Sequence, residues 1–195
     1  MAKVKVLVEG YAREEGDAEI ASCTVTLIQD NGKNIIVDPG MDRKRLLEAL
    51  KKEKLSVKDI DFVVLTHMHP DHILLTAMFE DAVVVDIAET FTFNGKIVSH
   101  KGKVPGTDVE LISTPGHEEC ECSVIADTDE GKVVVASDLF WWTDDAKQKT
   151  DRESLMNLKD PYMKDEKALK KSREKVLEIA DFIIPGHGKM FKVQK

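Results

Sequence analysis

The sequence contains no long apolar run of the kind that crosses a membrane. None of its uncharged apolar stretches approaches the ~18 residues that a spanning helix needs. Residues 1–6, MAKVKV, also lack the apolar core and the cleavage site of a secretory signal. We therefore expect a cytoplasmic protein with no membrane partner.

Cysteine is scarce as well. The chain has 3 cysteines, and Cys120 and Cys122 are separated by a single residue. An odd number with this spacing does not form a secreted disulfide framework, so a reducing compartment fits better.

Low-complexity tracts and Ser/Gly linkers are missing too. Because 195 residues suffice for one sizeable core, we expect a single domain over residues 1–195.

Basic residues are outnumbered by acidic ones, 28 against 36, which leaves a formal net charge of -8. This charge disfavours long-range attraction of nucleic acid, although lysines gathered on one face could still form a local basic patch. A small-molecule substrate is the partner we expect. The sequence leaves the oligomeric state open.

Short β-branched segments separated by Gly- and Asp-containing turns are typical of neighbouring strands. Such segments lie at residues 4–8, 24–28, 34–37, 62–65, 83–85, 109–112, 123–126, 132–136 and 182–184. Apolar residues at helical spacing predict helices over residues 43–54 and 164–180, and Asp42 is placed to cap the first of them. Two sheets with packed helices are expected.

Several of these strands end at a residue that can bind a metal. His67 follows residues 62–65, and His117, Asp138 and His187 each follow a later strand. Loops at strand ends are where sites are normally assembled, because the sheet holds them rigidly. Four such ends predict one common site.

The densest cluster is His67-x-His69-x-Asp71-His72. A lone histidine in a loop is usually a surface or hydrogen-bonded residue, but five of the 6 histidines lie in this motif or at strand ends beside glycine. Neutral imidazole and carboxylate suit zinc, iron or manganese, whereas few thiols lie nearby. The cluster indicates a catalytic rather than a structural metal site.

The sequence resembles the metallo-β-lactamase superfamily, whose pattern is His-x-His-x-Asp-His, a distant Gly-His, a distant Asp and a last Gly-His. The seven matching positions are His67, His69, Asp71, His72, His117, Asp138 and His187. The resemblance covers nearly the whole chain, includes Asp38-Pro39-Gly40, and is strongest to small stand-alone metallo-β-lactamase domain-containing proteins.

This resemblance implies an α/β (α+β) fold, a four-layer αββα sandwich with the site at one edge between the sheets. His67, His69 and His117 would hold one metal, Asp71, His72 and His187 a second, and Asp138 would bridge the two. Asp38 would orient a ligand imidazole through its other ring nitrogen; the alternative is a plain turn residue. The cofactors expected are two divalent ions, zinc first, with iron or manganese as alternatives.

A metal pair of this kind shares a water and lowers its pKa, which supplies a bridging hydroxide as nucleophile near neutral pH. The same metals polarise the substrate oxygen, so no Ser or Cys nucleophile is needed. Asp71 is the expected catalytic residue, because it is the one carboxylate inside the motif and could orient the hydroxide or carry a proton to the leaving group. We expect a dinuclear hydrolase of a small ester, thioester, lactone, amide or phosphodiester.

Three alternatives stay open: an iron-dependent oxidoreductase of the same fold with oxygen or sulfur chemistry, a compact RNA phosphodiesterase, and a non-catalytic metal-stabilised binding module. True β-lactamase activity is disfavoured by the missing export signal. Relatives of the glyoxalase II and nuclease types carry additional regions for which 195 residues leave no room.

The loops beside the motifs depart from many relatives, which have Gly after the first motif and Thr-x-Gly-Ser after the central one. This chain has Ile73-Leu74-Leu75 and Glu118-Glu119-Cys120-Glu121 there. The departures concern the substrate more than the metal. Beyond the motifs, Cys120-x-Cys122 could be redox-active or bind a soft metal, but we expect a structural role, because Cys122 opens an apolar strand and free cysteines are commonly buried. We expect one ring of Trp141-Trp142 to line the substrate pocket or both to pack in the core. We expect His100 to be solvated.

Overall fold

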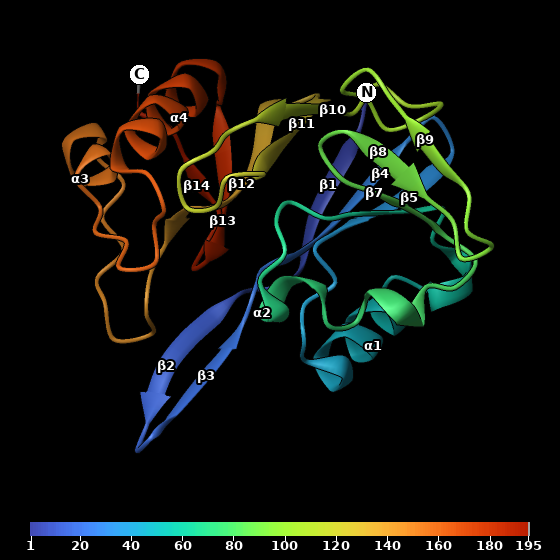
Figure 1. Ribbon diagram of the computed structural model, residues 1–195, viewed down its shortest axis with the longest axis horizontal. Helices are drawn as coiled ribbons and strands as arrows, with labels where there is room; N and C mark the ends of the chain where they lie inside the picture. The colour runs from blue at the N-terminus through green and yellow to red at the C-terminus, as the bar shows by residue number, and fades with distance from the viewer. Residues whose placement is uncertain (195) are drawn as a thin grey trace.

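Two β-sheets packed face to face form the centre of the structure, and helices cover the outer face of each sheet (Figure 1). The computed structural model describes residues 1–194. This succession of helix, sheet, sheet and helix confirms the predicted four-layer αββα sandwich. No helix in the described residues is long and apolar enough to span a bilayer.

The larger sheet has seven strands and the smaller has five. In sheet order, the larger consists of β1 (Lys3–Val8), β4 (Val25–Asp30), β5 (Lys33–Val37), β6 (Phe62–Val64), β7 (Val83–Val85), β8 (Glu89–Phe91) and β9 (Ile97–Ser99). The smaller consists of β10 (Glu110–Ser113), β11 (Cys122–Thr128), β12 (Gly131–Trp141), β13 (Phe182–His187) and β14 (Phe191–Lys192). The parallel pairs are β5 with β6, β6 with β7 and β12 with β13, so the parallel strands lie inside each sheet.

The remaining elements lie outside the two sheets. They are the antiparallel hairpin of β2 (Tyr11–Glu15) and β3 (Ala18–Ser22), the helices α1 (Arg43–Lys52), α2 (Pro70–Ile73), α3 (Arg152–Met156) and α4 (Glu166–Ile179), and two short 3-10 turns at Val57–Asp59 and Thr76–Met78. Figure 1 shows the β2–β3 hairpin extending away from the body of the molecule.

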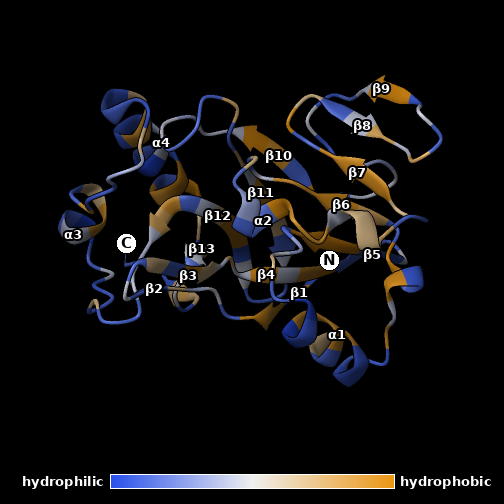
Figure 2. Cartoon of the chain, turned by 60° about the horizontal axis from the view of Figure 1, so that its bottom comes forward, coloured by the Kyte–Doolittle hydropathy of each residue, from blue (hydrophilic) through white to orange (hydrophobic). Residues whose placement is uncertain are grey.

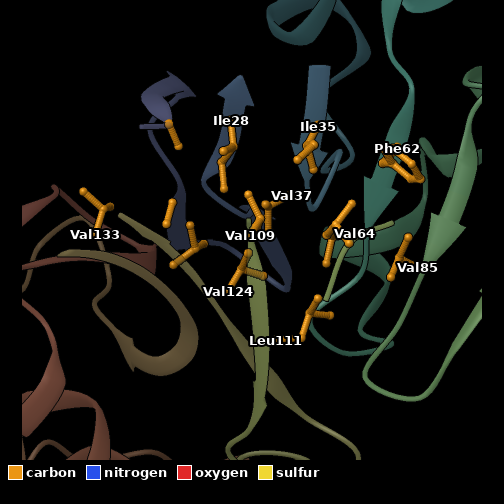
Figure 3. Close-up of a cluster of buried hydrophobic side chains, with 14 of the residues drawn as sticks. Ile28, Ile35, Val37, Phe62, Val64, Val85, Val109, Leu111, Val124 and Val133 are labelled. Carbon is orange, nitrogen blue, oxygen red and sulfur yellow. The ribbon is translucent and has the colours of Figure 1, made fainter. Parts of the chain in front are cut away.

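The main core fills the space between the sheets. Ile28, Val37 and Val64 of the larger sheet share it with Val124 and Val133 of the smaller one (Figure 3). Burying a side chain of this size stabilises the fold by roughly 1.5 to 3 kcal/mol. Figure 2 shows the corresponding pattern, with apolar strands inside and hydrophilic outer faces on α1 and α4. Smaller cores lie beneath α1 on one side and beneath α3 and α4 on the other.

The two longer helices begin where an aspartate caps them. Asp42 accepts from Arg45 N at 3.1 Å, as the sequence predicted. The second helix was predicted from residue 164 but begins at Glu166, because Asp165 is the cap and accepts from Lys167 N at 2.8 Å. The cap fixes this end of α4 next to the loop that carries His117, since Asp165 N also donates to Gly116 O at 3.0 Å.

Candidate metal centre

The two sheets meet near the ends of their central strands, where backbone hydrogen bonds join them. Thr66 O, two residues past the end of β6, accepts from Cys122 N of β11 at 3.0 Å. Gly186 O of β13 accepts from Thr24 N, just before β4, at 2.6 Å. The segments that carry the predicted ligands therefore start from a rigid junction.

All seven predicted ligands lie at this junction. Their nitrogen and oxygen atoms form two groups, each with its atoms within 4.8 Å of one another. One group is His67, His69, His117 and Asp138, and the other is Asp71, His72 and His187. Folding brings these side chains together from four separate segments. That they bind metal stays a prediction.

Asp138 stands between the two groups. Its Oδ2 lies 3.4 Å from His117 Nε2 and 3.9 Å from His67 Nε2. Its Oδ1 lies 3.3 Å from His72 Nε2 and 3.9 Å from His187 Nε2. One carboxylate thus turns a different oxygen to each imidazole pair, which is the arrangement of a bridging ligand.

Each group is completed by one further side chain. Asp71 Oδ2 lies 3.2 Å from His187 Nε2 and 3.7 Å from His72 Nε2. On the other side, His69 Nδ1 lies 3.1 Å from His117 Nε2. His69 therefore presents Nδ1 to the centre, whereas the other four imidazoles present Nε2.

Buried carboxylates fix the orientation of two of the imidazoles. His72 Nδ1 donates to Asp38 Oδ2 at 2.8 Å, which is the orienting role expected of Asp38. Asp38 itself is held by Thr66, whose N and Oγ1 donate to it at 2.8 and 2.6 Å. His117 Nδ1 donates to Asp160 Oδ2 at 2.8 Å. An outer N–H held in this way leaves the inner nitrogen as a lone pair for a metal.

Two more imidazoles donate outward to groups that only accept. His187 Nδ1 donates to the Tyr11 carbonyl at 3.0 Å, and His69 Nε2 donates to Glu118 Oε1 at 3.0 Å. The first contact ties the start of the β2–β3 hairpin to the centre. The second contact accounts for the reversed orientation of the His69 ring, which presents Nδ1 rather than Nε2 to the centre.

His67 is oriented by hydroxyl groups on a strained stretch of backbone. Its Nδ1 lies 3.2 Å from both Thr66 Oγ1 and Ser137 Oγ, and these two oxygens are 2.7 Å apart. Ser137 has a φ of 51°, which is unusual for a residue other than glycine, and the pairing of β12 with β13 shifts register there. The irregularity turns Asp138 toward the centre instead of continuing the strand alternation.

Three buried atoms at the centre have no hydrogen-bond partner among the described residues: His67 Nε2, His72 Nε2 and Asp138 Oδ1. A buried polar atom left unpaired costs about 1 to 3 kcal/mol, so most are paired in folded proteins. Seven nitrogen and oxygen donors without a thiolate suit zinc, iron or manganese. The residues present therefore fit a pair of divalent cations.

Burial and neighbouring charges set the protonation of the centre. Burial opposes ionisation of Asp138, but the charges of His72 and His187 outweigh it and hold the pKa of Asp138 well below its usual range. Burial, together with the charge of His72, lowers the pKa of His67 well below its ordinary value. Burial acts to lower the pKa values of His72 and His187, but neighbouring negative charges, Asp138 among them, raise both. Because an ionised carboxylate and a neutral imidazole are the forms that bind cations, Asp138 and His67 are already in the binding form, whereas His72 and His187 must release a proton.

Several partners of the imidazoles were not predicted from the sequence. Asp160 lies 43 residues from His117 in a loop with no motif, and the partner of His187 is a backbone carbonyl. Ser137 carries no pattern either. Glu118 was noted as a departure from the family pattern, and its place beside His117 is the one signal that could have suggested a role.

Cys23 forms a further group with Asp38 and His72 that the sequence did not suggest. Burial raises the pKa of the Cys23 thiol to about 12, and His72 Nδ1 is already bonded to Asp38. We assign Cys23 no ligand role. Cys122 is buried at the start of β11, in agreement with its structural interpretation, whereas Cys120 is exposed.

Two other expectations have clear outcomes. Trp142 packs in the core beneath α3 and α4, whereas Trp141 lines the cavity at the centre, so the two rings divide the roles between them. The prediction that His100 is solvated was wrong. It is half-buried, bonds to Asp86 O at 2.8 Å and accepts from Gly102 N at 3.1 Å.

A cavity of about 320 Å³ opens on the centre. Its floor is made of the ligands His69, Asp71, His117, Asp138 and His187, and its walls are Ala12, Glu19, Ala21, Met41, Pro70, Trp141 and Tyr162. Tyr162 Oη donates to Glu19 Oε1 of the β2–β3 hairpin at 3.3 Å. The cavity is thus bordered by the hairpin on one side and by the end of β12 and the loop between α3 and α4 on the other, and it has room for a small molecule.

Comparison with known proteins gives a consistent result. The family model of the metallo-β-lactamase superfamily matches residues 19–90. Metallo-β-lactamase domain-containing protein 1 of Xenopus laevis is 34% identical, over 98% of this chain and 82% of its own length. The Homo sapiens protein of the same name is 31% identical, over 97% of this chain and 82% of its own length.

Solved structures with the same fold differ in their metals. A Thermotoga maritima protein described as a metallo-β-lactamase has a TM-score of 0.70 and 23% identity, over 98% of this chain and 99% of its own. A dizinc quorum-quenching lactonase has a TM-score of 0.64 and 17% identity, over 87% of this chain and 73% of its own. The chemotaxis sensor ODP, in a peroxy diiron state, has a TM-score of 0.66 and 18% identity, over 98% of this chain and 85% of its own.

Proposed function

The chain belongs to the metallo-β-lactamase superfamily, and we propose that it is a dinuclear metal-dependent hydrolase with two divalent cations, zinc in the first place. The observation that supports this most directly is the placement of Asp138. Each of its oxygens faces a different pair of imidazoles, at 3.3 to 3.9 Å. A structural zinc site would not need a carboxylate shared between two ligand groups.

In this proposal His67, His69 and His117 would hold one cation, Asp71, His72 and His187 would hold the other, and Asp138 would contribute to both. When bound, the cation pair supplies an activated water as nucleophile and polarises the substrate oxygen on which charge develops.

Asp71 is the residue that we propose to orient the attacking water or to pass a proton to the leaving group. Its side chain is 18% exposed and lines the cavity, whereas Asp138 is buried at 7%. Asp71 is therefore the more accessible of the two carboxylates of the centre that line the cavity. The hydrogen-bonded contact with His187 Nε2 lowers its pKa and keeps it ionised, although burial acts in the opposite direction.

The cavity supports a small substrate. Its volume of about 320 Å³ and its apolar walls, among them Ala21, Met41 and Trp141, suit an ester, thioester, lactone, amide or phosphodiester with an apolar portion. The lactonase of the same fold is consistent with this range.

An iron-dependent oxidoreductase is the second candidate, because ODP shares the fold and contains two irons. The donor set of nitrogen and oxygen atoms suits iron as well as zinc. The metal and the need for oxygen distinguish the two functions. Iron with oxygen-dependent turnover favours the oxidoreductase, whereas zinc with turnover unaffected by removal of oxygen favours the hydrolase.

The test is elemental analysis of protein purified without added metal, followed by a screen of ester, thioester, lactone, amide and phosphodiester substrates. Asp138→Ala is the diagnostic variant, and Asp129→Ala, in the exposed turn between β11 and β12, is the matched control. We expect about two metal ions per chain in the wild type and the control. Asp138→Ala should lose metal and lower turnover by at least 100-fold. Full metal content and full activity in Asp138→Ala would contradict the proposal.

A further inference from the structure

A second cavity, of about 440 Å³, adjoins the metal centre without containing any of its ligands. It lies between the end of β12, the segment that follows it, and α3. Its lining comprises Trp141, Trp142, Thr143, Ala146, Lys147, Lys149, Ser154, Asn157, Leu158 and Lys159. The proposed hydrolysis does not use this space.

The charge of this cavity is of one sign. Lys147, Lys149 and Lys159 line it, and no acidic residue does. None of the three lysines forms an ion pair with another described residue. Of the acids in the same segment, Asp144 lies 3.4 Å from Arg13, and Asp151 caps α3 by accepting from Ser154 N at 2.9 Å and also interacts electrostatically with Lys149. One cavity is therefore lined by three lysines that form no ion pair with a described residue, in a chain of net charge -8.

The two cavities share one wall. Trp141 lines both of them, and its ring centroid lies 6.1 Å from that of His187. A molecule that reaches from one cavity to the other therefore passes over Trp141. Its reacting bond would lie at the metal centre and its distant end among the lysines.

From this arrangement we infer that the cavity lined by Lys147, Lys149 and Lys159, here called the lysine cavity, is an anion subsite. It binds a phosphate group of the substrate at a distance from the bond that is cleaved. Lysine ammonium groups bind phosphate as point charges, and Thr143, Ser154 and Asn157 add side-chain hydrogen-bonding groups. The inference rests on the proposed hydrolase function and narrows its substrate to small phosphorylated molecules. The negative net charge argues against a long nucleic-acid strand, because most of the surface would repel it.

The fluorescence of the protein provides a direct test. Both tryptophans of the chain, Trp141 and Trp142, line the lysine cavity. Titration of the metal-loaded protein with inorganic pyrophosphate at constant ionic strength should therefore change the tryptophan emission in a saturable manner. This readout needs no enzymatic turnover.

The variant for this test is the triple substitution Lys147→Gln, Lys149→Gln and Lys159→Gln. The matched control, Lys58→Gln, Lys101→Gln and Lys171→Gln, removes the same charge from exposed lysines elsewhere that form no ion pair with a described residue. We expect the first variant to bind pyrophosphate at least 10-fold more weakly than the wild type. The control should stay within about 2-fold, because distant surface charges are screened by salt.

Three results would overturn the inference: equal pyrophosphate affinity in both triple variants, equal affinity for citrate and pyrophosphate in the wild type, and tighter binding of a short oligonucleotide than of pyrophosphate. The first result means that the lysines do not bind the anion, the second that the site does not select phosphate, and the third that the ligand is a nucleic-acid strand.

Failure of the hydrolase proposal has a different signature. In that case Asp138→Ala would leave turnover unchanged, and the fluorescence titration would be unaffected.

Discussion

Each imidazole of the centre has its outer nitrogen bonded to the protein and its inner nitrogen facing the other predicted ligands. The outer partners include two buried carboxylates, Asp38 on His72 and Asp160 on His117. A carboxylate accepts but does not donate when ionised, so it fixes the tautomer as well as the ring angle. Metal affinity should therefore depend on residues that never touch the metal.

The first prediction concerns Asp160, which is fully buried at its side chain and bonded to His117 Nδ1. Asp160→Ala should weaken metal binding by about 10- to 100-fold, because His117 loses its fixed orientation. Competition with a chromophoric chelator measures this. Asp160→Asn keeps an acceptor oxygen and should fall between the alanine variant and the wild type. Unchanged affinity in a folded alanine variant would show that His117 is oriented without Asp160.

Glu121 is a buried acid that the proposed chemistry does not use. It is fully buried, and neither carboxylate oxygen has a hydrogen-bond partner among the described residues. Burial, followed by the charge of Asp138, raises the pKa of Glu121 well above its ordinary value. A raised pKa means that folding favours the protonated acid. The contribution of Glu121 to the free energy of unfolding is complete below the unfolded-state pKa of about 4.3. It is lost as the pH rises through the folded-state pKa.

The second prediction follows from this sign. Glu121→Gln mimics the protonated acid at every pH, so its melting temperature should match that of the wild type near pH 5 and exceed it increasingly toward pH 9. Circular dichroism melts of both proteins across this range measure the difference. Arg173 is the nearby buried cation, and its own pKa is lowered to about 10 by burial. If Arg173 held an ionised Glu121, the glutamine variant would instead be less stable at neutral and high pH.

At the scale of the elements, the pairing of β12 with β13 positions the bridging carboxylate. The register shift beside Ser137 brings Asp138 against Gly186 on the neighbouring strand. A Cβ on Gly186 would overlap Asp138 Oδ1, so glycine is required there for the close approach of a side chain. The β12–β13 pair is therefore part of the site as well as of the sheet.

The third prediction is that Gly186→Ala loses most of its metal while it remains folded, because the new methyl group displaces Asp138 Oδ1. Gly106→Ala is the control, since nothing lies within 4 Å of a Cβ there and its φ of 75° gives only backbone strain. That strain costs about 1 kcal/mol. Elemental analysis should show full occupancy in the control. Metal loss in both variants to the same extent would mean that displacement of Asp138 Oδ1 is not responsible, because Gly106 lies away from Asp138.

At the scale of the whole molecule, cations that bind only the folded chain stabilise it. At a metal concentration 100 times the dissociation constant, one site contributes about 2.7 kcal/mol. For a chain of this length 1 kcal/mol corresponds to roughly 2 to 4 °C in melting temperature.

The fourth prediction is therefore that zinc added to chelator-treated protein raises its melting temperature by at least 5 °C, as measured by differential scanning calorimetry. Asp138→Ala should show a much smaller rise. An equal rise in wild type and Asp138→Ala would place the stabilising metal elsewhere on the chain.

Many elements could be predicted from the sequence because their residues carry a periodic pattern. The central strands are continuous apolar runs, and β7 was predicted with its observed bounds. The β2–β3 hairpin was missed, because its strands carry several charged residues and half of their residues are exposed, so no continuous buried face imposes alternation. The short α3 and the short strands β8, β9 and β14 were missed for the same lack of a long pattern.

The sequence by itself determined which seven residues form the candidate site, and their side chains predict nitrogen and oxygen ligands of a metal. Only the tertiary structure decided which oxygen of Asp138 faces which imidazole pair, that Asp160 orients His117, and that three lysines surround a cavity behind Trp141. These depend on contacts between segments far apart in the chain, formed when the two sheets pack. Local pattern carries no information about such contacts, since the backbone geometry that creates them arises only on folding.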